Sequence, residues 1–129
     1  MKLANICVSA VTALGMLFYV NGAATVQAAE NAPHAFVVAI EDVRDIETFS
    51  KEYGPKVPAT LQPYGGRFVT RGGKLTALEG ELPSRFVIIE FDSAQNALNW
   101  YQSPEYQKLV PIRQKASKTT LFISEGTPK

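Results

Sequence analysis

Two arginines and a glutamate could form an anion-binding or acid–base site in this chain. Arg67 and Arg71 belong to the β-rich run RFVTR, and regular alternation along a strand would place both on one face. Glu90 interrupts the apolar run FVIIEF, where a carboxylate is costly unless it is paired. We expect the three to meet at the mouth of a cavity between a sheet and its helices, with Glu90 as acid or base and the arginines as anion clamps. A structural ion pair that holds the strand register explains the same pattern, and we favour it.

His34 is the only histidine and therefore the other candidate base. It lies beside a short leader, so we expect an exposed imidazole without a catalytic role. Cys7 is the only cysteine, and it lies in a segment that we expect to be removed. The sequence thus predicts no metal site, no cofactor and no thiol nucleophile, and it contains no GxSxG elbow.

Aromatic side chains with polar tips could line a pocket for a small, partly apolar molecule. Tyr64, Trp100 and Tyr106 are the candidates for contact with such a ligand, together with Tyr101. More often, such residues are simply parts of the core and its rim.

The first 28 residues have the pattern of a secretory signal peptide. Lys2 is followed by an apolar middle that is shorter than the ~20 residues of a spanning helix, and Val26 and Ala28 occupy the positions that signal peptidase reads. We expect cleavage after Ala28, a flexible leader over 29–33, a domain over 34–126 and a tail over 127–129. The mature protein would then be exported, either periplasmic or secreted, with no membrane anchor.

The charge balance argues against nucleic acid as a partner. The chain has 13 basic and 12 acidic residues, and removal of Lys2 makes the two numbers equal. Nucleic acids and anionic membrane surfaces both need clustered basic residues, and no such block is present.

Hydrophobic periodicity predicts the order β-α-β-β-α-β. Ser93 follows the run 85–91 and can cap a helix, while Ser103 and Pro104 can open another that Pro111 kinks or ends. The strands are expected over 35–43, 67–71 with a continuation over 74–79, 85–91 and 119–124, and the helices over 46–62, 94–102 and 104–110.

This order predicts a ferredoxin-like α+β fold, a four-stranded antiparallel sheet with its helices on one face. The run 35–40 is apolar on both faces, and so is most of 85–91. Because one copy would leave one of these faces in water, we expect a homodimer in which two sheets pack face to face.

Several motifs resemble domain-of-unknown-function family 1330, of the dimeric α+β barrel group. They run in order along the chain, namely YGGR at 64–67, RGG at 71–73, LEG at 78–80, the run 86–91, Trp100-Tyr101 and SPEYQ at 103–107 followed by Arg113. The resemblance covers residues 34 to about 126 and implies the same dimer. Members of this family are commonly cytoplasmic, and the export signal sets this chain apart.

Two functions remain open from the sequence. The first is a non-catalytic exported dimer that binds a small organic ligand in its cavity. The second is a cofactor-independent enzyme of the monooxygenase, isomerase or dehydratase type acting on a small aromatic or lactone substrate, as the wider barrel group implies. A protonatable group buried beside an open cavity would favour the enzyme, and a filled interior with every arginine paired would favour the binder.

Overall fold

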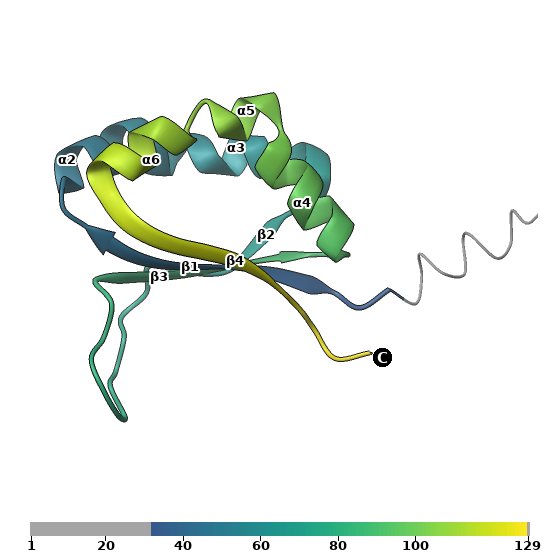
Figure 1. The fold of residues 1–129 in the computed structure, drawn as a ribbon, viewed down its shortest axis with the longest axis horizontal. Coiled ribbons are helices and arrows are strands. Elements are labelled where there is room, and N and C mark those ends of the chain that lie inside the picture. Colours follow the sequence, from purple (N-terminus) through teal and green to yellow (C-terminus); the bar gives the residue numbers. More distant parts are fainter. Residues whose placement is uncertain (1–31, 129) are drawn as a thin grey trace, which may run out of the picture.

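A computed structural model describes residues 32–128, so the predicted signal peptide and most of the leader lie outside the described residues. The four strands are β1 (Ala35–Val43), β2 (Arg67–Arg71), β3 (Arg85–Phe91) and β4 (Ser117–Glu125). They form one antiparallel sheet in the order β2-β3-β1-β4, and the helices cover one face of it (Figure 1). The predicted ferredoxin-like α+β fold is confirmed.

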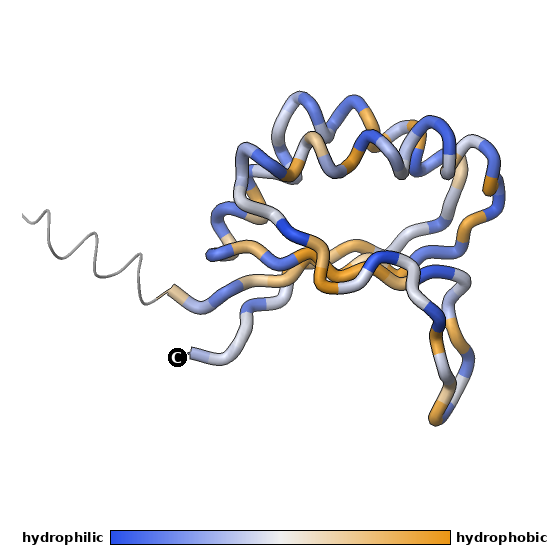
Figure 2. The backbone as a smooth tube through the Cα atoms, turned by 180° about the vertical axis from the view of Figure 1, so that it is seen from behind, coloured by the Kyte–Doolittle hydropathy of each residue, from blue (hydrophilic) through white to orange (hydrophobic). Residues whose placement is uncertain are grey.

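The two faces of the sheet differ in what covers them. On β1 the inner face, below the helices, carries Ala35, Val37 and Ala39, all buried. The outer face carries Phe36, Val38 and Ile40 in alternation with them, and no helix of the described chain covers it (Figure 1). Figure 2 shows that strongly hydrophobic residues gather in the middle of the sheet. The outer face is therefore apolar and uncovered in a single copy.

The first helical segment consists of short turns. Asp45 accepts a hydrogen bond from the backbone N–H of Thr48 at 3.0 Å, as expected of an N-cap. Phe49 and Tyr53 point into the core, but Ile46, predicted to join them, is 71% exposed. The segment runs through α2 (Ile46–Thr48), η1 (Phe49–Tyr53), η2 (Gly54–Lys56), α3 (Val57–Leu61) and η3 (Gln62–Tyr64). Because η1 is a π-helical turn, its wider spacing takes Ile46 off the stripe that Phe49 and Tyr53 share.

The second helical segment follows β3. It comprises α4 (Ala94–Gln102), α5 (Pro104–Gln107) and α6 (Val110–Ala116). Ser93 and Ser103 cap the first two helices, as predicted. Pro111 was expected to kink or end a helix, but it lies in the first turn of α6, where its missing N–H leaves no hydrogen bond unmade.

The segment between β2 and β3 leaves the sheet as an arm, residues 72–84. It projects on the side away from the helices (Figure 1), and Leu78 on it is 95% exposed. The predicted strand over 74–79 is wrong, since the strand ends at Arg71 and Gly72 turns the chain away with a φ of +66°. No residue of the arm belongs to a strand.

The core lies between the inner face of the sheet and the helices. Its largest fully enclosed side chains are Trp100, Tyr106 and Phe91. Trp100 and Tyr106 stack with ring centroids 4.0 Å apart. None of the helices in the described part of the chain is both long and apolar enough to span a bilayer.

Candidate functional site

An inner cavity of about 30 Å³ lies between the inner sheet face and the helices. Its walls are mainly apolar and include Ala39, Val87 and Ile89 from the sheet and Phe49 and Val57 from the helical side. Since roughly 10–15 Å³ is enough for one water molecule, the cavity has room for water or for a small group of a ligand.

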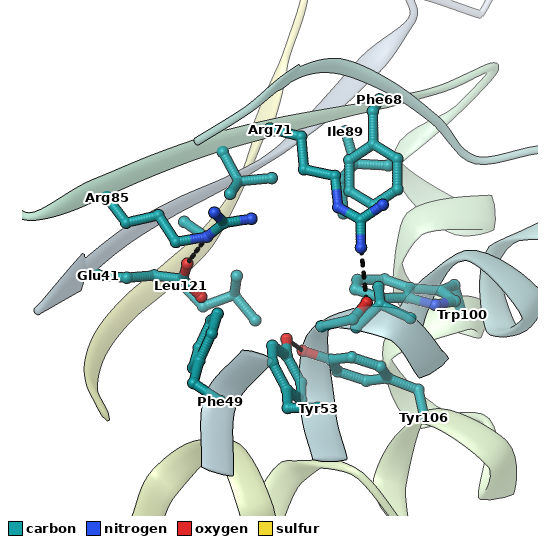
Figure 3. A pocket seen from close by; sticks show the side chains of 14 residues that line it. Glu41, Phe49, Tyr53, Phe68, Arg71, Arg85, Ile89, Trp100, Tyr106 and Leu121 are labelled. Carbon is teal, nitrogen blue, oxygen red and sulfur yellow. Dashed lines mark hydrogen bonds and ion pairs between the residues drawn. The ribbon is translucent and has the colours of Figure 1, made fainter. Parts of the chain in front are cut away.

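An outer cleft of about 450 Å³ adjoins this cavity. Phe49, Gly54, Arg71 and Arg85 line both spaces, so these residues form the boundary between them. Arg71 and Arg85 extend toward the boundary from the sheet (Figure 3). We treat the inner cavity and the outer cleft together as the candidate site.

Glu41 is the carboxylate of this site. It lies opposite Arg85 in the β1–β3 register, and Arg85 Nε is 3.0 Å from Glu41 Oε2. The two atoms are not aligned as a hydrogen bond, which leaves both without a hydrogen-bond partner. Burial raises the pKa of Glu41 above its ordinary 4.5, and the positive charges of Arg85 and Arg113 offset only part of this. Glu41 is therefore a buried carboxyl group that keeps its proton to higher pH than an exposed glutamate does.

Two phenols face the cavity from the helical side. The hydroxyls of Tyr53 and Tyr106 lie 3.1 Å apart, and each residue is buried (Figure 3). Burial raises the pKa of both phenols, so both keep their protons. Because one hydroxyl donates to the other, the accepting hydroxyl still has an O–H to offer to a third group.

Trp100 forms part of the wall beside these phenols. Its indole N–H donates to Thr60 Oγ1 at 3.0 Å, and only 1% of the residue is exposed. Of the predicted ligand-contacting aromatics, Trp100 and Tyr106 line the inner cavity. Tyr64 packs against the core and lines neither space.

Arg67 and Arg71 lie on opposite faces of the sheet, and the prediction that they share one is wrong. A bulge between Phe68 and Thr70 shifts the register, so that Arg67 pairs with Glu90 and Arg71 with Val87. Arg71 thus points to the inner face, where its Nη2 donates to the carbonyl of Gly54 at 2.6 Å. Its guanidinium lies over the ring of Phe68, 4.5 Å from the centroid.

Glu90 lies on the outer face, so its predicted position at the mouth of the cavity is wrong. Its Oε1 is 2.5 Å from His34 Nδ1, and its Oε2 accepts from Arg67 Nε at 3.0 Å. The hydrogen bond with His34, followed by that with Arg67, lowers the pKa of Glu90. The His34 side chain is hydrogen-bonded to Glu90 and only 30% exposed, so the expectation of an exposed imidazole is wrong.

The sequence reasoning missed Glu41, Arg85 and Tyr53 as site residues. A signal for Glu41 was present, because it continues the alternation of Ala35, Val37 and Ala39 and so belongs to the inner face. Arg85 could be placed at the site only once the pairing of β1 with β3 was known, because that pairing puts it opposite Glu41. No group of three or more histidine, cysteine or acidic side chains suited to a metal occurs within residues 32–128.

Comparison with solved structures identifies two crystal structures of similar fold. Two crystal structures of the RPA0582 protein, one of them of methylated protein and the other described as of unknown function from Rhodopseudomonas palustris, are each 19% identical to this chain. Their TM-scores are 0.63 and 0.62, and the alignments cover 81% of this chain and 88% and 90% of the other. A conserved protein from Methanosarcina mazei Go1 is 14% identical over 76% of this chain and 97% of its own, with a TM-score of 0.48.

No curated protein matches the sequence. The sequence model of the family described as "Domain of unknown function (DUF1330)" matches residues 34–127, which is nearly all of the part that the structure describes. The chain therefore belongs to the DUF1330 family.

Proposed function

We propose that this protein binds a small, partly apolar organic molecule in the space between its sheet and its helices. The observation that carries the proposal is that the inner cavity and the outer cleft share Phe49, Arg71 and Arg85 and so form one site. A cleft of about 450 Å³ is within the range of small-molecule pockets, and a mainly apolar wall with a few polar groups is their usual composition.

Two neighbouring residues provide the test. Ala39 lines the inner cavity, whereas Ile40 faces the opposite side of the sheet. Native mass spectrometry of protein purified from its own host should reveal a retained small molecule. Ala39→Leu should lose that molecule because the added carbons fill the cavity, and Ile40→Leu should keep it. If the wild type carries no ligand and no compound of a broad panel quenches the fluorescence of Trp100, the proposal fails.

We also propose that the protein is a homodimer whose two outer sheet faces pack together. The apolar side chains of that face support it, namely Phe36, Val38 and Ile40 of β1, Phe86 and Ile88 of β3 and Phe122 of β4, as their cross-strand pairing places them side by side. Burial of such a patch contributes about 25 cal/mol per Å² of apolar surface.

Val38 is central in this face, since it pairs with Ile88 on one side and Phe122 on the other. In light scattering, Val38→Lys should halve the measured mass at micromolar concentration, because it buries a charge in the interface. Gln95→Lys, on the exposed surface of α4, should leave the mass unchanged. A wild-type protein that is already a monomer would refute the dimer.

Export is the third part of the proposal, and the pattern of residues 1–28 supports it. Cell fractionation followed by N-terminal sequencing tests it directly. We expect a mature protein that begins at Ala29 in the periplasm or the medium. An intact N-terminus in the cytoplasm would refute it.

A cofactor-independent enzyme is the second candidate function, and Glu41 is the observation that favours it. A buried carboxyl with a raised pKa, close to the phenol pair of Tyr53 and Tyr106, suits proton transfer of the isomerase or dehydratase type. The test is exchange of C–H protons of an unsaturated five-membered lactone in D2O, followed by NMR. Exchange that Glu41→Gln abolishes would establish catalysis, and absence of exchange in the wild type would favour binding alone.

A further inference from the structure

The candidate site contains more positive than negative charge. Glu41 is the carboxylate that lines it, while Arg71 and Arg85 both line it and Arg113 lies close enough to lower the pKa of Glu41. Arg85 pairs with Glu41, but within residues 32–128 neither Arg71 nor Arg113 has a carboxylate at ion-pair distance. Arg113 is 4% exposed, and its Nε has no hydrogen-bond partner. Arg71 is exposed at the edge of the site, so its charge is accessible to a ligand, and two lining arginines against one lining carboxylate favour an anion.

Arg71 is the arginine best placed to hold that anion. Its ring contact with Phe68 and its hydrogen bond to the Gly54 carbonyl fix the guanidinium at the boundary between the two spaces (Figure 3). A guanidinium has five N–H donors, and the Gly54 contact uses one of its two terminal nitrogens. The planar fork that remains matches the two oxygens of a carboxylate.

The side chains that line the outer cleft indicate the chemistry of the rest of the ligand. Val43, Ile46 and Pro55 line it, and Ile46 is largely exposed because nothing in the described chain covers it. A purely ionic ligand would leave these side chains in water, whereas an apolar body would cover them.

We infer that the ligand is a small organic acid. Its carboxylate binds the guanidinium of Arg71 at the boundary, and its apolar body lies in the outer cleft against Val43, Ile46 and Pro55. This inference rests on the proposed function and narrows it to one class of ligand.

Calorimetric titration with matched pairs of probes tests the inference. The acids are benzoate and cyclohexanecarboxylate, and the controls are benzamide and cyclohexanecarboxamide, which have nearly the same shape and no charge. The wild type should bind the acids at least tenfold more tightly than the amides. Arg71→Met should weaken the acids by roughly 10- to 100-fold, the value of a charge-assisted hydrogen bond, and leave the amides unchanged.

Arg67→Met is the matched control, because Arg67 is on the same strand but on the outer face. It should leave the affinity for both acids unchanged, with light scattering used to confirm that its assembly equals that of the wild type. If the amides bind as tightly as the acids, or if Arg67→Met weakens the acids as much as Arg71→Met does, the inference is overturned and the proposed binding site remains. If neither acids nor amides bind, the inference is overturned, and the retained-ligand measurement with Ala39→Leu decides separately whether the proposed function stands.

Discussion

Glu41 and Arg85 are direct cross-strand neighbours whose side chains meet at 3.0 Å on the inner face of the sheet. Only 3% of the Glu41 side chain is exposed, against 26% of that of Arg85. The pair therefore connects a group that is shielded from water to one that reaches the outer cleft. The pair thus joins a buried carboxyl group to a partly exposed guanidinium that lines the outer cleft.

Glu41→Gln should make the protein more stable at neutral pH, by roughly 0.5–2 kcal/mol, because a neutral amide avoids the desolvation cost of a buried carboxylate. The raised pKa of Glu41 means that the folded state holds its proton more tightly than the unfolded state. Wild-type stability therefore falls as the pH rises above the ordinary carboxyl pKa, and the neutral amide avoids that loss. Urea unfolding across pH measures the difference, which should vanish at low pH. A variant that is less stable at neutral pH would contradict the raised pKa.

Arg85→Met should destabilise the protein by about 3 kcal/mol at neutral pH, because it leaves a buried carboxylate without its partner. The loss should shrink as the pH falls and Glu41 takes up a proton. Lys51→Met is the control, since it removes an ion pair with Glu47 in which both side chains are more than two-thirds exposed. Its effect should stay below about 0.5 kcal/mol at every pH.

Glu90→Gln should show the opposite pH dependence to Glu41→Gln. The pKa of Glu90 is lowered, so its contribution to stability is present above the ordinary carboxyl pKa and is lost as the pH falls through the lowered value. The variant should therefore be less stable at neutral pH and equal to the wild type in strong acid. Unchanged ligand affinity alongside this loss would establish Glu90 as structural, and a lost ligand would argue for a role in binding.

Gly72→Ala should destabilise the protein by about 1–2 kcal/mol. Gly72 has a φ of +66°, and a Cβ there would overlap the guanidinium of Arg85. Gly73→Ala is the neighbouring control, because its Cβ would meet no atom closer than 3.8 Å. Thermal unfolding should separate the two variants, and a crystal structure of Gly72→Ala should show Arg85 displaced. Equal stability of both variants would exclude this contact.

Tyr53→Phe and Tyr106→Phe should each cost about 1 kcal/mol, since each leaves the other buried hydroxyl without its partner. The double variant should cost less than the sum, because no orphaned hydroxyl remains. A double-mutant cycle in urea measures this coupling. Additive losses would mean that the two hydroxyls are satisfied independently.

Most of the fold follows from local signals in the sequence. Ser93 and Ser103 predict where α4 and α5 begin, and the apolar run that ends at Phe91 predicts the position of β3. Such features depend on a few adjacent residues, so a single sequence is enough to predict them.

The site depends on contacts between distant residues, and there the sequence was less informative. The run RFVTR alternates regularly, so its sequence does not predict the bulge. Because of that bulge, Arg71 lies on the inner face of the sheet and Arg67 on the outer face. Glu41 was overlooked because a glutamate at the end of a strand is usually in water. Its ion-pair partner is Arg85, which the register of β1 and β3 brings opposite.

The uncovered outer face and the enclosed inner face belong to the same strands, and alternate residues serve each. This arrangement has a consequence for protein engineering. If the proposed binding site and dimer are correct, a library that randomises only the inward positions of β3, such as Val87 and Ile89, should change ligand selectivity while leaving Phe86 and Ile88 intact for the proposed association. The proposed ligand recognition and the proposed self-assembly would then be open to separate alteration, because inward and outward positions alternate along each strand.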